Sequence, residues 1–163
     1  MNKENFQSIK FIKKKNIIQG GYRLKKKYKP PLFSLVTAVY NGEKYIEETI
    51  KSVLKQNKKL YEHIIIDGGS KDNTLKIIKK YNKKIAYWIS EKDKSLYYAF
   101  NKGMRLSTGR YIVIINSDDR FTSNALKIIE KYIYRYPEKD FIFGSVKKHW
   151  GIVHGYIPKK IHY

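Results

Sequence analysis

The sequence lacks cysteine altogether among its 163 residues, which excludes disulfide bonds, thiolate metal sites and cysteine nucleophiles. Acidic residues are scarce, with 14 Asp and Glu against 35 Lys and Arg. The resulting formal net charge of +21 favours polyanionic partners such as nucleic acid or an anionic membrane surface, although a general bias toward lysine would produce the same charge without a partner. No run approaches the roughly 20 apolar residues that span a bilayer, and no secretory signal is visible. We therefore expect a cytoplasmic protein, or one that is peripheral on the inner face of the membrane.

Length and composition predict one core flanked by two short segments. Residues 1–31 are strongly basic and end at Pro30 and Pro31, so they are expected to form an N-terminal extension. Residues 32–147 are long enough for a single hydrophobic core. Residues 148–163 form a short tail without Asp or Glu.

Hydrophobic periodicity alternates between strand-like and helix-like segments across the core. The expected strands are residues 32–40, 63–67, 85–90, 110–116 and 141–146. The expected helices are residues 43–56, a helix from the N-cap Ser70 to about Tyr81, residues 95–106, and a fourth helix between its N-cap Ser123 and Pro137. The fourth helix should turn Leu126, Ile129, Ile133 and Tyr136 inward. Such alternation predicts an α/β fold, with right-handed βαβ units and a mostly parallel sheet that carries helices on both faces.

The strand before Asp118 and Asp119 is an uninterrupted apolar run, Tyr111–Ile115, and is therefore expected to be buried on both faces. Two adjacent carboxylates at its end need positive charge or a set of donors opposite them, which a metal ion would supply. The alternative is a solvated turn that also caps the next helix. The two interpretations are equally consistent with this motif alone.

Polar residues also follow each of the other parallel strands. They are Tyr40 and Asn41, Asp67 to Ser70, and Glu91 with Asp93. Each group alone is consistent with an ordinary turn. In a doubly wound sheet, however, all these loops lie on one rim at the switch point of the sheet, where ligands bind. The four loops together favour a binding site.

The sequence lacks two common nucleotide-binding motifs, and this limits the kind of binding site that it can form. Val39–Glu43 contains one glycine, where a dinucleotide-binding turn has three, and no P-loop is present. What remains is a nucleotide site with an aromatic ring for the base, a carboxylate for polar edges, and a carboxylate that holds a divalent metal at the phosphates. Oxygen donors of this kind suit Mg²⁺ or Mn²⁺.

Five motifs in this order resemble the family 2 glycosyltransferases with the Rossmann-like GT-A fold, especially the bacterial members that build surface polysaccharides. The motifs are Ser34–Asn41 (SLVTAVYN), Ile65–Ser70 (IIDGGS), Tyr87–Asp93 (YWISEKD), Asn101–Gly103 (NKG) with Thr108 and Gly109, and Asn116–Asp119 (NSDD). The resemblance covers residues 20 to about 146. It implies an inverting enzyme that moves a sugar from a nucleoside diphosphate sugar to an acceptor hydroxyl.

The resemblance also implies roles for individual residues. Tyr40 matches the residue that stacks on the base, Asp67 the carboxylate that contacts the base edge, and Asp118 the residue that contacts the ribose or the donor sugar. Asp119 matches the metal ligand of the D-x-D-like motif, with Ser117 in the place of the first Asp. The full set of implied nucleotide-sugar ligands is Thr37, Ala38, Tyr40, Asn41, Asp67, Asp93 and Asp118.

The sequence departs from the family pattern at two places. Ser95 and Tyr98 stand where the family usually has the Gly and the Asp of Gly-Ile-Tyr-Asp-Ala. Family members also continue for about a hundred residues with the acceptor pocket and the catalytic base, so the C-terminal acceptor half is expected to be missing. The remaining candidates for a base are Glu91, Asp93 and the tail histidines His149, His154 and His162.

Two function classes therefore stay open. One is a small glycosyltransferase in surface polysaccharide or glycolipid synthesis, with a sugar or lipid-linked acceptor and with a partner chain or self-association to complete it. The other is a truncated relative that only binds nucleotide sugar or a partner. A nucleic-acid binder is disfavoured because no recognised nucleic-acid motif is present. The basic residues 1–31 are expected to dock on an anionic membrane, or else to be a solvated extension.

Overall fold

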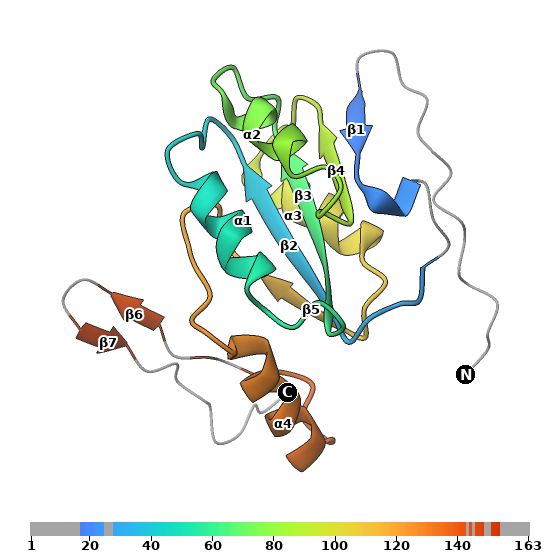
Figure 1. Cartoon of the computed structure of the whole chain (residues 1–163), viewed down its shortest axis with the longest axis vertical. Helices are drawn as coiled ribbons and strands as arrows, with labels where there is room; N and C mark the ends of the chain where they lie inside the picture. Colours follow the sequence, from blue (N-terminus) through green and yellow to red (C-terminus); the bar gives the residue numbers. More distant parts are fainter. Residues whose placement is uncertain (1–16, 25–27, 143, 145, 149–150, 154–163) are drawn as a thin grey trace. The chain divides into compact units, whose positions relative to one another are not determined.

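The structure is a computed structural model that describes residues 17–24, 28–142, 144, 146–148 and 151–153 (Figure 1). The chain divides into two compact units, Met1–Ala125 and Leu126–Tyr163. In this described part, no helix combines the length and the apolar character needed to cross a membrane.

The first unit is built on a five-stranded sheet. Its four parallel strands are β2 (Phe33–Val39), β3 (Tyr61–Asp67), β4 (Tyr87–Ser90) and β5 (Tyr111–Ile114). The strand order is β1-β4-β3-β2-β5, with the short β1 (Ile18–Gly20) antiparallel to β4. The chain leaves β2 toward β3 and β4 on one side and returns to β5 on the other, so the sheet is doubly wound around β2. The predicted α/β class and the mostly parallel sheet are confirmed.

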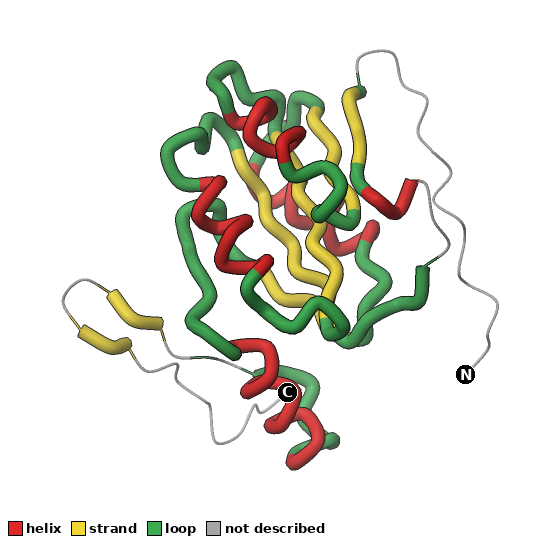
Figure 2. The backbone as a smooth tube through the Cα atoms, in the orientation of Figure 1, coloured by secondary structure: helices red, strands yellow, loops and turns green. Residues whose placement is uncertain are grey.

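Helices cover both faces of this sheet, as predicted (Figures 1 and 2). α1 (Ile46–Leu54) and α2 (Thr74–Lys80) pack on one face, and α3 (Leu96–Leu106) packs against β2 and β3 on the other. Side chains of β3 alternate between the two cores: Ile65 belongs to the α1 and α2 side, whereas Ile64 and Ile66 belong to the α3 side. This alternation follows from the period of two in a strand.

The Asn101–Gly103 motif owes its glycine to the packing of α3 on the sheet. A Cβ on Gly103 would lie 2.3 Å from Cγ1 of Val36, a distance that no side chain can occupy. Only glycine lets the helix approach β2 this closely. The helix begins at Leu96, where the hydroxyl of Ser95 accepts a hydrogen bond from the Tyr98 amide at 3.4 Å.

The prediction that β5 is buried on both faces is wrong. Ile112 and Ile114 are 45% and 51% exposed, and β5 pairs only with β2 in the described sheet. Ile114 lies opposite Val36, whose side chain faces α3. Because α3 lies over β2 and β3, it leaves this side of β5 open. The sequence run is apolar enough for a central strand, but the described fold makes it an edge strand.

Residues 18–24, assigned from the sequence to the basic extension, are part of the folded unit. They form β1 and the 3₁₀ helix η1 (Tyr22–Leu24), and Arg23 reaches the fully buried carboxylate of Glu62 at 2.9 Å. Tyr28 donates to the same carboxylate at 2.6 Å. Ser34 and the backbone and hydroxyl of Thr108 supply three more hydrogen bonds to it. A buried charge needs this kind of compensation, and here the N-terminal segment provides part of it.

The second unit contains most of α4 (Ala125–Arg135) and a hairpin of β6 (Val146–Lys148) with β7 (Gly151–Val153). Leu126 and Ile133 are buried as predicted, but Tyr136 is 39% exposed and stacks on Tyr132. α4 begins at Ala125, after Asn124 with φ of 61°, so Ser123 does not occupy the predicted N-cap position.

The strand predicted for residues 141–146 is not found at its described positions 141, 142 and 144. Phe141 and Ile142 are 66% and 40% exposed, and no described strand pairs with them. A strand needs a neighbour for its backbone groups, and the extended structure begins only at Val146. The candidate bases His149, His154 and His162 lie outside the described residues.

A buried histidine gives the first unit a pH dependence. Burial lowers the pKa of His63 from 6.5 to about 3, while one ring nitrogen of His63 lies 3.0 Å from the hydroxyl of Thr37. Above pH 6.5 the imidazole is neutral in both the folded and the unfolded chain. Between pH 6.5 and about 3 the unfolded chain binds a proton that the folded chain does not, so the free energy of unfolding falls as the pH falls.

We expect the variant His63→Gln, which retains an amide for Thr37, to lose this part of the acid sensitivity. The difference between the two proteins should change by up to roughly 1.4 kcal/mol per pH unit across that window. Urea unfolding at a series of pH values from 7 to 4 measures it. Parallel stability curves for the two proteins would show that His63 does not titrate on unfolding.

Candidate functional site

The carboxyl ends of the four parallel strands form one rim, as the strand order requires. Close contacts between their loops confirm that they adjoin. A Cβ on Gly68 would lie 3.6 Å from the ring of Tyr40, and a Cβ on Gly42 would lie 3.7 Å from the hydroxyl of Ser117. Gly69, with φ of 81°, approaches the backbone of Lys92. The loops after β2, β3, β4 and β5 are therefore neighbours.

Hydrogen bonds lock the loop after β2 to the loop after β3. The Asn41 amide donates to the Ser70 hydroxyl at 2.8 Å, and the Lys71 amide donates to the Asn41 side-chain oxygen at 2.9 Å. Asn41 has a φ of 50°, a left-handed conformation that Asn adopts more readily than most residues. The predicted ligand Asn41 thus shapes the rim through both its backbone and its side chain.

A second set of bonds continues the same junction. The Gly42 amide donates to the Thr74 hydroxyl at 2.8 Å, the Glu43 amide donates to Asp72 at 3.0 Å, and the Asn73 amide donates to Glu43 at 2.8 Å. Each loop therefore caps backbone groups of the other. Loops that are already ordered lose less conformational entropy when a ligand binds.

Tyr40 presents an aromatic face at this rim. Its side chain is 59% exposed although the preceding strand residues are buried. The absence of a side chain at Gly68 leaves the ring uncovered on that side. An exposed aromatic ring beside polar loops is suited to stacking on a nucleotide base.

Asp67 is placed differently from an exposed ligand. It is 0% exposed, and it accepts hydrogen bonds from the Ser70 hydroxyl at 2.5 Å and from the Ser90 hydroxyl at 2.5 Å. Ser70 therefore holds Asp67 and does not cap α2, which begins at Thr74. The carboxylate ties β3 to β4 at the rim, and its contact with a base stays a prediction.

Thr37 and Ala38 also lie inside the molecule. Thr37 is 0% exposed and contacts His63, while Ala38 is 4% exposed and belongs to the core beneath α3. Both residues come from the strand itself and not from its end. Both are therefore enclosed in the folded chain, and direct contact with a nucleotide sugar stays a prediction.

The loop after β4 carries a cluster of opposite charges. The Lys102 ammonium lies 2.5 Å from Glu91 and 2.6 Å from Asp93. Burial opposes ionisation of this lysine, but the hydrogen bonds with Asp93 and Glu91 outweigh it and raise the pKa of Lys102. The second oxygen of Asp93 is buried and makes no hydrogen bond within the described residues. Because this oxygen is enclosed, contact of Asp93 with a nucleotide sugar stays a prediction.

Asp118 and Asp119 are both exposed at the rim. The side-chain amide of Asn116 donates to the carboxylate of Asp119 at 3.0 Å. The Thr49 hydroxyl of α1 lies 2.8 Å from the carbonyl oxygens of Ser117 and Asp119, which fixes the backbone of the loop. Because both side chains are exposed, neither carboxylate contributes to the core, and their contact with a metal or a donor stays a prediction.

The rim offers two carboxylates to a magnesium or manganese ion, which is fewer ligands than a site made of protein side chains alone would need. In the described part of the chain, no group of three or more His, Cys, Asp or Glu side chains could hold a metal by itself. Mg²⁺ is usually held by one or two carboxylates together with the phosphates of the substrate. The exposed pair Asp118 and Asp119 fits that mode of binding.

Sequence reasoning missed the residues that hold the site residues in place. Thr49, Ser90 and Lys102 contact the loops that carry Asp119, Asp67 and Asp93. Thr49 falls in the apolar stripe of its helix and Ser90 ends a buried strand, so periodicity marks both as core positions. Only the Asn101–Gly103 motif pointed to Lys102, without a role for it.

Comparison with known proteins identifies the family. The chain belongs to glycosyl transferase family 2, which matches residues 34–161. It is 36% identical over 100 residues to TuaG of Bacillus subtilis (strain 168), a glycosyltransferase named for teichuronic acid biosynthesis, with 60% of this chain and 40% of TuaG covered. An uncharacterized glycosyltransferase of Rickettsia conorii, RC0461, is 36% identical over 118 residues, which are 71% of this chain and 19% of RC0461.

Solved structures confirm the GT-A-like fold. S. aureus TarS 1–349 in complex with UDP-GlcNAc has a TM-score of 0.58 and 29% identity, with 64% of this chain and 32% of TarS 1–349 covered. The mannosyltransferase PcManGT of Pyrobaculum calidifontis, in complex with GDP-Man and Mn²⁺, has a TM-score of 0.58 and 20% identity, with 77% and 40% covered. The chain thus spans less than half the length of the relatives named here.

Proposed function

We propose that this chain binds the sugar donor of an inverting glycosyltransferase, which transfers a sugar from a nucleoside diphosphate sugar to an acceptor hydroxyl in surface polysaccharide or glycolipid synthesis. The observation that carries the proposal is the rim itself. It combines an exposed aromatic ring, Tyr40, with the exposed carboxylates Asp118 and Asp119 on adjacent loops of one sheet. Those groups match the base and the metal-bound diphosphate of such a donor.

Each part of the donor has a proposed partner. The base stacks on Tyr40, Asp118 contacts the ribose or the donor sugar, and Asp119 holds Mn²⁺ or Mg²⁺. The bound metal would neutralise charge on the diphosphate leaving group. The second Asp93 oxygen, which has no partner within the described residues, is proposed to accept a hydrogen bond from a hydroxyl of the donor. Asn41 and Asp67 act mainly by fixing the loops that surround the base.

The relatives support this assignment at the level of their names. TarS 1–349 was solved with UDP and with UDP-GlcNAc, and PcManGT with GDP-Man and Mn²⁺. The name of TuaG refers to teichuronic acid biosynthesis, which favours a surface polymer as the product of the present chain. We extend these properties to the present chain as a proposal, because the matched segments cover only part of each relative.

A thermal-shift screen tests the proposal. We expect UDP, GDP or one of their sugar derivatives to stabilise the chain only when Mn²⁺ or Mg²⁺ is present. A ligand at 100 times its dissociation constant adds about 2.7 kcal/mol. Release of free nucleotide after addition of membrane-extracted acceptor would distinguish an active transferase from a chain that only binds its donor. Binding of none of these nucleotides, with or without metal, would refute the proposal.

The basic residues ahead of β1 carry a further part of the proposal. We expect them to attract the chain to an anionic membrane, where lipid-linked acceptors are located. Each Lys or Arg near such a surface contributes on the order of 1 kcal/mol, and salt screens the attraction. Deletion should stop at residue 16, because Arg23 belongs to the folded unit.

Vesicle sedimentation measures this attraction. Wild-type protein should sediment with vesicles that contain anionic lipid and should be released as the salt concentration rises. The chain without residues 1–16 should sediment less. Equal sedimentation of the two proteins would assign any binding to the general positive charge of the fold.

A further inference from the structure

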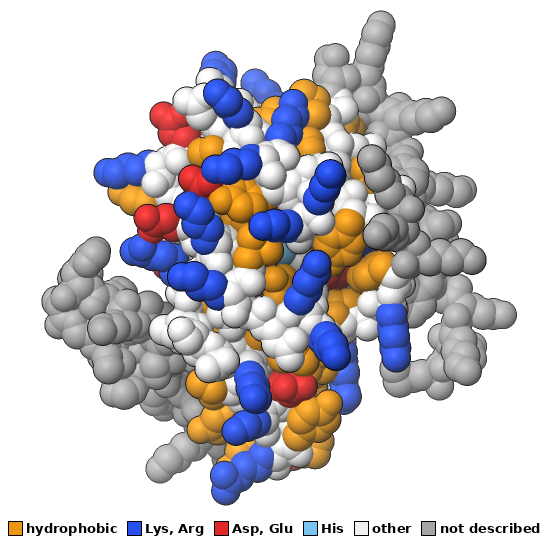
Figure 3. All heavy atoms as spheres, viewed as in Figure 1, with side chains coloured by type: hydrophobic (Ala, Val, Ile, Leu, Met, Phe, Trp, Pro, Cys, Tyr) orange, Lys and Arg blue, Asp and Glu red, His pale blue; other side chains and the backbone are white. Residues whose placement is uncertain are grey.

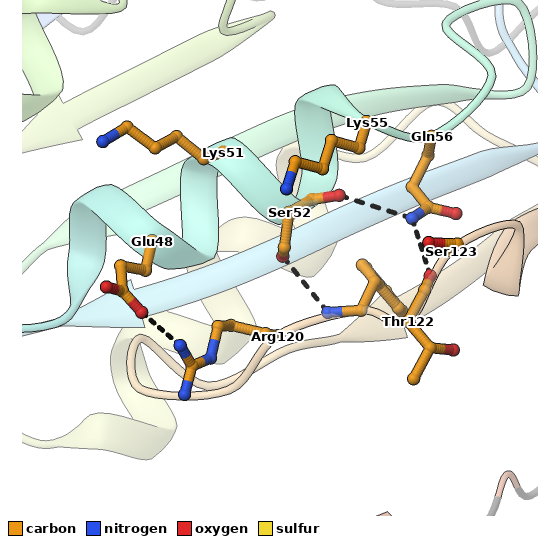
Figure 4. Close-up of a pocket in the computed structure, with 9 residues that line it drawn as sticks. Glu48, Lys51, Ser52, Lys55, Gln56, Arg120, Thr122 and Ser123 are labelled. Carbon is orange, nitrogen blue, oxygen red and sulfur yellow. Dashed lines mark hydrogen bonds and ion pairs between the residues drawn. The ribbon is translucent and has the colours of Figure 1, made fainter.

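A hollow of about 600 Å³ lies between α1 and the segment that follows Asp119. Lys51 and Ser52 of α1 and Lys55 directly after it line one side, and Arg120 and Thr122 line the other side (Figure 4). The donor rim proposed above does not use these side chains. The volume lies within the usual range of small-molecule sites, roughly 300–1,000 Å³.

The floor of the hollow is polar and fixed. Ser52 and Gln56 are 7% and 5% exposed. The Ser52 hydroxyl accepts a hydrogen bond from the Phe121 backbone amide at 3.1 Å, and the side-chain amide of Gln56 donates to the Thr122 carbonyl at 3.0 Å (Figure 4). These bonds join α1 and the residues directly after it to the facing segment, so the two walls keep their spacing without a ligand.

The walls carry more positive than negative charge. Lys51, Lys55 and Arg120 stand against a single carboxylate, Glu48, which pairs with Arg120. Lys51 makes only a 3.7 Å contact with Glu47. Within the described residues, the Lys55 ammonium forms no ion pair. Lysines are spread over the whole face that carries α1 and α2 (Figure 3), but here they border a concave surface with hydrogen-bonding groups at its base.

The hollow is connected to the donor rim through the backbone. Arg120 follows the proposed metal ligand Asp119 directly. The Thr49 hydroxyl of α1 binds the carbonyl oxygens of Ser117 and Asp119, three positions before Ser52. A ligand in the hollow would therefore lie against the segment that carries Asp118 and Asp119.

We propose that this hollow binds an anionic sugar unit, one that bears a phosphate or a carboxylate, in the acceptor chain. The ammonium groups of Lys51 and Lys55 bind the anion, while the side chains of Thr122 and Ser123 bind sugar hydroxyls. A single oxyanion would leave most of the volume unfilled, which favours a sugar that carries the charge. The assignment to the acceptor depends on the proposed function, but the binding itself does not.

NMR titration of the ¹⁵N-labelled chain tests the site, with glucose 1-phosphate, glucuronate, glucose and inorganic phosphate as probes. The two charged sugars should shift the amide signals of Ser52, Gln56 and Phe121. Glucose and inorganic phosphate should bind these positions at least about tenfold more weakly, because each lacks half of the contacts. Binding of inorganic phosphate as tight as that of glucose 1-phosphate would overturn the sugar assignment.

Paired charge variants provide the control. The double variant Lys51→Gln/Lys55→Gln should weaken the binding of glucose 1-phosphate at least about tenfold. The variant Lys83→Gln/Lys84→Gln removes the same charge from two exposed lysines outside the hollow and should leave the affinity unchanged. An equal loss in both variants would show that only the overall charge attracts the probe, and the site would be refuted.

Nucleotide binding at the rim and sugar binding in the hollow are tested independently. If no nucleotide binds at the rim but glucose 1-phosphate shifts the amide signals of Ser52 and Phe121, the sugar site in the hollow is supported and the proposed function is refuted. If UDP or GDP binds with metal while neither charged sugar shifts the signals of the hollow, the sugar site is refuted and the proposed function is supported.

Discussion

Replacement of Asp119 by Asn is expected to abolish metal-dependent nucleotide binding and to leave the fold intact. The exposed carboxylate contributes little to the core, and Asn can still accept the hydrogen bond that the Asn116 amide makes with this side chain. The stability without ligand should therefore stay within about 0.5 kcal/mol of wild type. The loss of negative charge removes a ligand that holds a cation against the diphosphate. The stabilisation of about 2.7 kcal/mol that a saturating nucleotide gives with Mn²⁺ should disappear.

Calorimetry with UDP and GDP in the presence of Mn²⁺ measures the effect directly. The matched control is Glu47→Gln, which removes one carboxylate from the side of α1 that contacts α2, where Glu47 pairs with Lys80. It should bind nucleotide like wild type. Wild-type nucleotide affinity of the Asp119→Asn variant in the presence of Mn²⁺ would refute the assignment of Asp119 as the metal ligand.

The largest loss of stability is expected from Glu62→Gln. This variant keeps the size of the side chain but removes the negative charge opposite Arg23, whose side chain is only 5% exposed. A buried cation without its partner typically costs about 3–5 kcal/mol. Total stabilities of single domains are about 5–15 kcal/mol, so the variant should unfold at a clearly lower urea concentration.

Glu48→Gln is the matched control for this experiment. Glu48 also pairs with an arginine, Arg120, but both side chains are more than half exposed. Exposed pairs contribute about 0–1 kcal/mol, so the control should unfold almost like wild type. Similar urea midpoints for the two variants would mean that the Glu62 network contributes no more than a surface ion pair.

The sequence predicted the helices and the parallel strands of the first unit because their residues have a clear period. Ile65 and its neighbours alternate between two cores, and α1 carries its apolar residues on one side. The status of β5 as an edge strand could not be predicted, because Ile112 and Ile114 are as apolar as central-strand residues. Whether such residues are buried depends on which helix lies over them, and this is a property of the tertiary fold.

The placement of the candidate site residues was predictable where exposure follows from position at a strand end. Tyr40, Asn41, Asp118 and Asp119 come after their strands and lie at the rim. Asp67 also ends a strand, yet Ser90 and Ser70 enclose its carboxylate. That enclosure depends on the pairing of β3 with β4 and on a left-handed Gly69, and neither can be read from a motif.

The contacts around Glu62 also affect the order in which the chain can fold during synthesis. Arg23 donates to the carbonyl oxygen of Leu106, 83 positions away, and the Thr108 amide donates to Glu62 across 46 positions. The ribosome adds residues from the N-terminus, so Arg23 emerges long before Leu106 and Thr108. The first unit cannot close this network until the α3–β5 connection has left the exit tunnel. Until then the nascent N-terminal segment stays available to chaperones.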